Sequence, residues 1–289
     1  MMAALRRRVE AAVPPLGSFV EIDGARIHYV DRGSGPAIVL IHGLGGVLGN
    51  FTYALVDRLA TRMRVIALDR PGAGYSTRPR GMSAALREQA RTIVRFIESL
   101  GIEKPLVCGH SLGGSIAIAL ALEAPQIPRA LALIAPQTYP LRKAPAPFAG
   151  LVIPSPLIRA VVAHTIAIPI AMRTAPRVVG AIFAPEPVPE DFAVKGGALL
   201  GLRATQFFSA STDLIAARGG IAGIAAHYGE LRLPVHVLYG AQDHVLDCRK
   251  HGEMFEREVK AVDLTVVPGG HMLPVTQPDL VANWIFGLS

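Results

Sequence analysis

Short runs of apolar residues recur in both halves of the chain and alternate with segments of helical spacing. Runs of five or six apolar residues bounded by turn residues are typical of strands buried on both faces of a sheet. Leu86, Ala90 and Ile93, by contrast, share one face of a predicted helix. The alternation predicts strands at 19–23, 26–30, 37–41, 64–68, 105–108, 130–134, 235–239 and 262–267, and helices at 51–60, 83–100, 112–124, 250–259 and 278–287.

This order of elements predicts an α/β fold with an eight-stranded, mostly parallel sheet flanked by helices. The first two predicted strands flank Asp23-Gly24, a dipeptide typical of a tight hairpin, so they are expected to be antiparallel. The remaining six strands are separated by long connections and are expected to be parallel.

The alternation stops for about a hundred residues after the strand that ends at Ile134. Helical stretches with eleven prolines between Pro136 and Pro189 take its place, and a structureless loop of that length would be unusual in a compact domain. We therefore expect a helical cap at 139–230, inserted into a core formed by 1–138 and 231–289.

Composition excludes several classes of protein. The chain has 289 residues, of which 51% are hydrophobic, so it is neither disordered nor fibrous. Its 29 Lys and Arg against 22 Asp and Glu give a net charge of +7, but the basic residues are scattered apart from Arg6-Arg7-Arg8. We expect no nucleic-acid partner and a weak contact with a membrane surface. Cys108 and Cys248 are too few for a disulfide framework or a metal cluster, so no metal is expected.

The N-terminal segment lacks the apolar core of a signal peptide, because Glu10, Pro14 and Pro15 follow the arginines. A cytoplasmic protein is therefore expected. The most apolar stretch, 157–172, contains Arg159, His164 and Pro169 and is shorter than a membrane span. It is interpreted as a buried or lipid-touching helix.

The strongest chemical signal is Gly109-His110-Ser111-Leu112-Gly113, placed between a predicted strand and a predicted helix. This context predicts a nucleophile elbow, in which Ser111 occupies a sharp turn and its neighbours must be small. The non-catalytic alternative is a glycine-rich turn in which the serine only caps the helix. The strand-to-helix context favours the elbow.

A second glycine-rich loop, residues 42–46 with the sequence HGLGG, follows the first parallel strand. Its backbone amides are expected to face the space above the sheet, where the amides of Leu44 and Leu112 would form an oxyanion hole. His42 lies at an inner strand end, and a structural hydrogen-bonding role is favoured over a role as catalytic base.

These motifs, together with DRPGAGYS at 69–76, GAQDHVLD at 240–247 and GGHMLP at 269–274, resemble the α/β-hydrolase fold family over nearly the whole chain. The resemblance implies a catalytic triad in the order nucleophile, acid, histidine, which selects Ser111, Asp243 and His271.

Other residues compete for these roles. Asp247 lies four residues further from the strand end than the favoured acid, and the loop after Ile134 offers Gln137 in place of a carboxylate. His244 is expected to point away from the site. The neighbouring Gly43, His110 and Met272 are expected to contact substrate.

A serine nucleophile predicts acyl transfer to water without a cofactor. Because the cap is rich in Ala, Ile, Val, Leu and Pro, the expected reaction is hydrolysis of a small to medium apolar carboxylic ester, by a carboxylesterase or lipase-like enzyme. Two alternatives stay open: hydrolysis of a carbon–carbon bond in a ring-cleavage product, and a non-catalytic ligand receptor on the same fold. The sequence leaves monomer and homodimer equally open.

Overall fold

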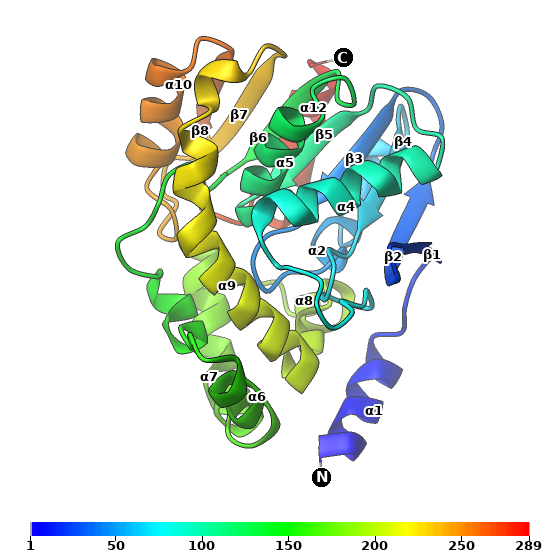
Figure 1. The fold of residues 1–289 in the computed structure, drawn as a ribbon, viewed down its shortest axis with the longest axis vertical. Coiled ribbons are helices and arrows are strands. Elements are labelled where there is room, and N and C mark those ends of the chain that lie inside the picture. The colour runs from blue at the N-terminus through cyan, green and yellow to red at the C-terminus, as the bar shows by residue number, and fades with distance from the viewer. Residues whose placement is uncertain (1, 289) are drawn as a thin grey trace.

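The computed structural model describes residues 2–288 and contains one eight-stranded sheet (Figure 1). Its strand order is β1-β2-β4-β3-β5-β6-β7-β8. The pairs β1·β2 and β2·β4 are antiparallel, and the other neighbours are parallel. The strands are β1 (Ser18–Ile22), β2 (Ala25–Arg32), β3 (Ala37–Ile41), β4 (Arg64–Leu68), β5 (Leu106–His110), β6 (Ala130–Ile134), β7 (Val235–Gly240) and β8 (Val262–Val267). The predicted eight-stranded α/β sheet is confirmed.

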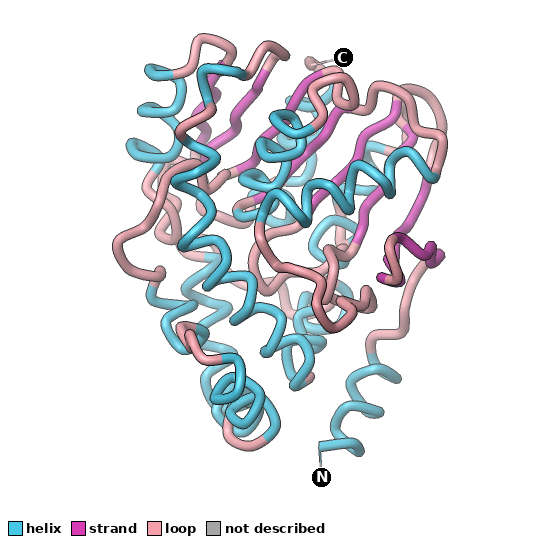
Figure 2. Tube along the Cα trace, in the orientation of Figure 1, coloured by secondary structure: helices cyan, strands magenta, loops and turns pink. Residues whose placement is uncertain are grey.

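Helices cover both faces of the sheet (Figures 1 and 2). On one face lie α4 (Leu86–Ser99), α5 (Leu112–Glu123), α10 (Met254–Glu258) and the second half of α9 (Ala204–Ala225). On the other face lie α2 (Gly49–Thr52), α3 (Leu55–Leu59), α11 (Leu273–Thr276) and α12 (Pro278–Phe286). The central strands β3, β5 and β6 are almost entirely buried, which explains why their sequences are apolar without alternation.

Some helices differ from the sequence prediction. The expected helix 51–60 is divided into α2 and α3, because Ala54 has the non-helical dihedral angles φ −153° and ψ −34°. The expected helix 250–259 begins as a π-helical turn, η4 (Arg249–Glu253), before α10. The N-terminal helix α1 (Met2–Ala12) was not predicted; its sequence carries three consecutive arginines and little apolar periodicity.

The insertion between β6 and β7 is helical and forms the end of the molecule away from the sheet (Figure 2). It contains η1 (Ala146–Leu151), α6 (Pro156–His164), α7 (Ala167–Phe183), α8 (Phe192–Lys195), η2 (Ala198–Leu202), α9 and η3 (Tyr228–Glu230). The long helix α9 leaves this region and packs against α4 and α5, so Ala217, Ile221 and Ile224 join the core beside the sheet.

The interpretation of 157–172 as one helix is wrong, and so is its buried alternative, whereas contact with lipid stays a prediction. The segment is divided between α6 and α7 at Thr165 and Ile166, and most of its large apolar side chains are exposed rather than buried. Within residues 2–288, no single helix is long and apolar enough to span a membrane, although α6 and α7, bent by 78°, pass that criterion as a pair.

A buried ion pair connects the insertion to the core. Arg70, in the loop after β4, is fully buried and donates to Asp213 of α9 at 2.8 Å and to Gln89 of α4 at 2.7 Å. Arg78 donates to the other oxygen of Asp213 at 2.6 Å. One carboxylate therefore bridges two guanidinium groups and fixes α9 against the loop that follows β4.

Replacing this carboxylate tests its structural role. Asp213→Ala leaves the fully buried Arg70 charge unpaired, and we expect the free energy of unfolding to fall by about 3–5 kcal/mol in urea denaturation. The control is Asp57→Ala, which removes the exposed ion pair with Arg32 and should cost less than about 1 kcal/mol. Equal losses in the two variants would show that the buried pair has no special role.

Candidate active site

Ser111 occupies a strained turn between β5 and α5. Its backbone has φ 56° and ψ −121°, a left-handed φ that a non-glycine residue rarely adopts. The turn is held by its neighbours, because the Ser111 amide donates to the carbonyl of Ile134 at 2.9 Å and the amides of Gly114 and Gln137 donate to the Ser111 carbonyl. This is the geometry expected of a nucleophile elbow.

The glycines around the turn are required by close packing. A Cβ on Gly113 would lie 2.1 Å from the carbonyl oxygen of Ile41, and a Cβ on Gly109 would lie 2.4 Å from that of Gly113. Both separations are far below van der Waals contact. The small residues of the motif therefore allow the start of α5 to lie directly against β3 and β5.

Asp243 and His271 form a buried hydrogen-bonded pair beyond the ends of β7 and β8. Nδ1 of His271 lies 2.7 Å from Oδ2 of Asp243, and both side chains are almost completely buried. The second oxygen, Oδ1, accepts from the amides of Val245 and Leu246 at 2.8 and 2.9 Å. Asp243 is thereby oriented from both sides.

The pKa of Asp243 is lowered by this arrangement. Burial alone would raise the pKa, but the charge and hydrogen bond of His271 and the two amides outweigh it. Asp243 is therefore an ionised partner that favours the His271 tautomer with a proton on Nδ1 and leaves Nε2 as the acceptor.

His110 connects the elbow to the histidine loop. Its Nε2 donates to the backbone carbonyl of His271 at 2.9 Å, and the two rings lie 4.9 Å apart between centroids. Burial and the neighbouring His271 lower the pKa of His110 to about 3, so the ring is neutral and uncharged near the site. Among residues 2–288, neither Ser111 Oγ nor His271 Nε2 has a hydrogen-bond partner, and the two atoms are not bonded to one another.

The predicted oxyanion loop lies directly against the serine. A Cβ on Gly43 would come within 2.9 Å of the Ser111 Cβ. In the described part of the chain, the amides of Leu44 and Leu112 donate no hydrogen bond to protein, which leaves both amides available to an external oxygen. The oxyanion hole formed by these two amides stays a prediction.

Arg70 donates hydrogen bonds to two backbone carbonyls of this loop, a role that the sequence did not reveal. Its Nε donates to the His42 carbonyl and its Nη2 to the Gly43 carbonyl, both at 3.0 Å. The guanidinium thus fixes the orientation of the peptide that carries the Leu44 amide. The signal in the sequence is the DRPGAGYS motif at 69–76, whose second residue is Arg70.

His42 has main-chain partners at both nitrogens. Its Nδ1 donates to the Gly43 carbonyl at 2.9 Å, and its Nε2 accepts from the Arg70 amide at 3.0 Å. Burial and the Arg70 charge lower its pKa to about 4. These contacts agree with the structural role favoured from the sequence.

The competing residues are placed elsewhere. Asp247 accepts from the amide of Arg249 at 3.0 Å, at the start of η4, and His244 is exposed. Gln137 contacts the elbow only through its backbone, with its amide donating to Ser111 and its carbonyl accepting from the Ser115 hydroxyl.

The insertion also contacts the histidine loop. Glu186 accepts from the amide of Gly270 at 3.1 Å through both carboxylate oxygens, a contact that the sequence did not suggest. Met272 is buried in an apolar cluster with Phe183, Phe192 and Val275. Within residues 2–288, no group of three His, Cys, Asp or Glu side chains is arranged to hold a metal ion.

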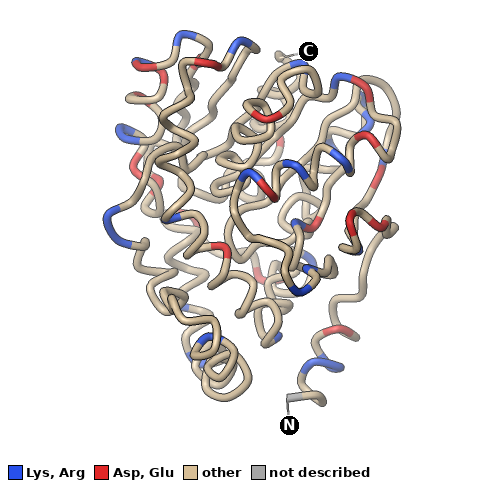
Figure 3. Tube along the Cα trace, viewed as in Figure 1, with Lys and Arg blue, Asp and Glu red and all other residues tan. Residues whose placement is uncertain are grey.

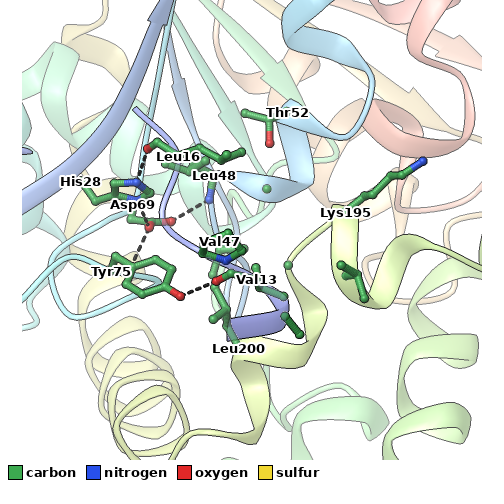
Figure 4. Close-up of a pocket in the computed structure, with 15 residues that line it drawn as sticks. Val13, Leu16, His28, Val47, Leu48, Thr52, Asp69, Tyr75, Lys195 and Leu200 are labelled. Carbon is green, nitrogen blue, oxygen red and sulfur yellow. Dashed lines mark hydrogen bonds and ion pairs between the residues drawn. The ribbon is translucent and has the colours of Figure 1, made fainter. Parts of the chain in front are cut away.

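A separate cavity of about 190 Å³ lies between the N-terminal segment, α2 and the insertion (Figure 4). Its walls are mostly apolar, with Leu48 and Leu200 among them. The imidazole and the carboxylate in its wall are bonded to each other, because His28 Nδ1 lies 2.7 Å from Asp69, whose other oxygen accepts from the Leu48 amide. Ser111 and its partners do not line this cavity.

Comparison with known sequences gives partial matches. A family model described as alpha/beta hydrolase fold matches residues 36–155. A dihydrolipoyllysine-residue acetyltransferase component of an acetoin cleaving system from Cupriavidus necator is 44% identical over 119 residues, which are 41% of this chain and 31% of that protein. Haloalkane dehalogenase 2 of Mycobacterium tuberculosis is 41% identical over 99 residues, 34% of each chain. The chain thus spans about a third of the length of these curated relatives.

Solved structures match over almost the whole chain. The enol-lactonase from Burkholderia xenovorans has a TM-score of 0.76 and 19% identity, covering 93% of this chain and 98% of that chain. A membrane phospholipase A described as a bacterial virulence factor has a TM-score of 0.74 and 23% identity, covering 99% and 89%. At these identities, the similarity is one of fold.

The two candidate acids can be separated by substitution. Asp243→Asn removes the acceptor that orients the His271 ring, and we expect kcat for an ester substrate to fall on the order of ten-thousandfold. Asp247→Asn should alter kcat far less, because Asp247 contacts only the start of η4. Both variants are compared at one pH after circular dichroism has shown that they are folded, and the reverse ranking would reject Asp243 as the acid.

Proposed function

We propose that the chain is a member of the α/β-hydrolase fold family and a serine hydrolase that cleaves carboxylic esters through an acyl-enzyme intermediate. The observation that carries the proposal is the buried 2.7 Å bond between Asp243 and His271, at the same edge of the sheet as the strained turn that presents Ser111. A buried carboxylate–imidazole pair beside an elbow serine is the combination that nucleophilic acyl transfer needs.

In the proposed reaction, Nε2 of His271 takes the proton of the Ser111 hydroxyl as its oxygen attacks the ester carbonyl. The amides of Leu44 and Leu112 stabilise the oxyanion of the tetrahedral intermediate. His271 then donates the proton to the leaving alcohol, and Asp243 stabilises the imidazolium between the two transfers. Water, activated in turn by His271, releases the acid from Ser111.

The identity of the nucleophile argues against the reaction named for one of the relatives. Dehalogenation through an alkyl-enzyme ester requires a carboxylate as nucleophile, whereas position 111 carries a hydroxyl. A serine forms an acyl ester readily, so acyl transfer to water is the chemistry this residue supports.

The proposed substrate carries an apolar acyl or alcohol group. The cluster of Phe183, Phe192, Met272 and Val275 joins the insertion to the segment directly after His271. The insertion thus packs buried apolar side chains against the segment that follows the catalytic histidine, and Glu186 holds it there through Gly270. This supports a small to medium apolar ester as substrate.

Covalent labelling tests the nucleophile. A fluorophosphonate should modify the wild-type protein and fail to modify Ser111→Ala, which should also retain less than about a thousandth of wild-type kcat. Ser115→Ala is the matched control, because this serine lies one turn along the same segment with its hydroxyl bonded to the Gln137 carbonyl. Equal labelling of wild type and Ser111→Ala would show that the nucleophile is another residue.

Chain-length dependence tests the apolar pocket. Each buried CH₂ of the acyl chain should improve transition-state binding by up to about 0.8 kcal/mol until the pocket is full. We therefore expect kcat/KM for p-nitrophenyl esters to rise with chain length and to reach its maximum between about four and eight carbons. A series that falls from acetate upward would reject the apolar pocket, whereas inactivity on every ester with Ser111 still labelled would favour carbon–carbon hydrolysis or a receptor.

A further inference from the structure

We propose that the cap tip, defined as residues 156–177 of α6 and α7, docks onto an anionic lipid bilayer. This surface is distinct from the candidate catalytic residues, and the proposal does not depend on the assigned reaction. More than half of the surface of each of six large apolar side chains on the cap tip is exposed: Leu157, Ile158, Val161, Ile166, Ile170 and Met172. Clusters of this kind mark sites of contact with other molecules or membranes.

The helix α6 has its polar and apolar faces reversed relative to an ordinary surface helix. Its arginine, Arg159, is buried and donates to Ser211 at 3.0 Å and to the carbonyl of Ile153 at 2.7 Å. Leu157 and Val161 lie on the outside instead, with 81% and 62% of their surface exposed. A surface helix in water normally has the opposite arrangement, so the outer face of α6 is suited to an apolar environment.

The shape of the cap tip suits a position at the bilayer–water interface better than a span across the bilayer. The helices α6 and α7 contain 9 and 17 residues and meet at a bend of 78°. Neither helix is long and apolar enough to span the hydrocarbon layer. A bent apolar pair at the end of the molecule can instead immerse its outer side chains to the depth typical of interfacial helices.

Charge identifies the headgroups that fit this surface. Residues 124–185 contain six Lys and Arg and no Asp or Glu, and Figure 3 shows basic but no acidic positions along α6 and α7. Arg173 and Arg177 are exposed on α7, directly after the exposed apolar positions. Their long side chains can reach anionic headgroups while the apolar residues enter the bilayer.

The N-terminal helix adds basic charge at the same end of the molecule. In Figure 1, α1 and the cap helices lie together at one end of the longest axis, and both α1 and α7 contact η2. Arg6, Arg7 and Arg8 are exposed on α1. A flat anionic surface would therefore meet two basic elements.

A second copy of the chain is a poorer partner for this face. In a twofold contact the same surface meets itself, so Arg173 and Arg177 would approach their own copies. No carboxylate within 124–185 is available to neutralise them. An anionic bilayer supplies the missing charge.

Vesicle flotation tests the proposal with the complete chain. Wild type should float with phosphatidylcholine vesicles that contain about 30% phosphatidylglycerol and should bind pure phosphatidylcholine more weakly. This difference in binding between the two lipids should disappear in about 0.5 M salt. Leu157→Gln/Val161→Gln should lower partitioning about tenfold or more on both lipids. Arg173→Gln/Arg177→Gln should lower it about 20-fold on anionic vesicles alone.

Matched substitutions control for net charge and surface hydrophobicity. Arg232→Gln/Lys260→Gln removes two exposed charges just before β7 and β8, at the sheet edge opposite the catalytic loops, and Leu16→Gln/Val266→Gln removes two exposed apolar side chains outside the cap. Both controls should float like wild type, and circular dichroism melts should show that all variants are folded. The proposal is overturned if wild type does not float or if tip and control variants float equally. It is also overturned if the tip substitutions only dissociate a lipid-free dimer in sedimentation equilibrium.

Discussion

The turn at Ser111 is the constraint on which the rest of the candidate site depends. Its left-handed backbone is unfavourable for a residue with a side chain, so it persists only because the surrounding chain holds it. Hydrogen bonds from Ser111 to β6 and from Gly114 back to Ser111 supply that support. The same turn leaves the Leu112 amide unpaired at the start of α5, so one local geometry accounts for both the unpaired hydroxyl and half of the proposed oxyanion hole.

The buried Arg70 extends this constraint from the elbow to the insertion. Its guanidinium donates to backbone carbonyls of the 42–46 loop, and its charge is paired with Asp213 of the inserted helix α9. The loop that faces Ser111 therefore owes its orientation partly to a residue more than a hundred positions away. Glu186 makes a comparable connection to the histidine loop through Gly270. The insertion is thus tied to both loops that flank the proposed nucleophile.

The sequence predicted the sheet well because its central strands are buried on both faces and consist of uninterrupted apolar residues. The choice of Asp243 and His271 as partners came from the resemblance to the α/β-hydrolase fold family, whose chain order is nucleophile, acid, histidine. The contacts of Arg70 and Glu186 could not be predicted, because they depend on how the insertion folds back onto the core. The exposure of Leu157 and Val161 was missed for a related reason: composition reports that a helix is apolar but not which face meets the protein.

Trapping the acyl-enzyme tests the central claim most directly. If Ser111 is the nucleophile, acid quenching during turnover of a slowly deacylated ester should leave protein heavier by one acyl group. Peptide mass spectrometry should place that group on Ser111. An adduct on another residue, or rapid ester turnover with no covalent adduct at any time, would contradict the account.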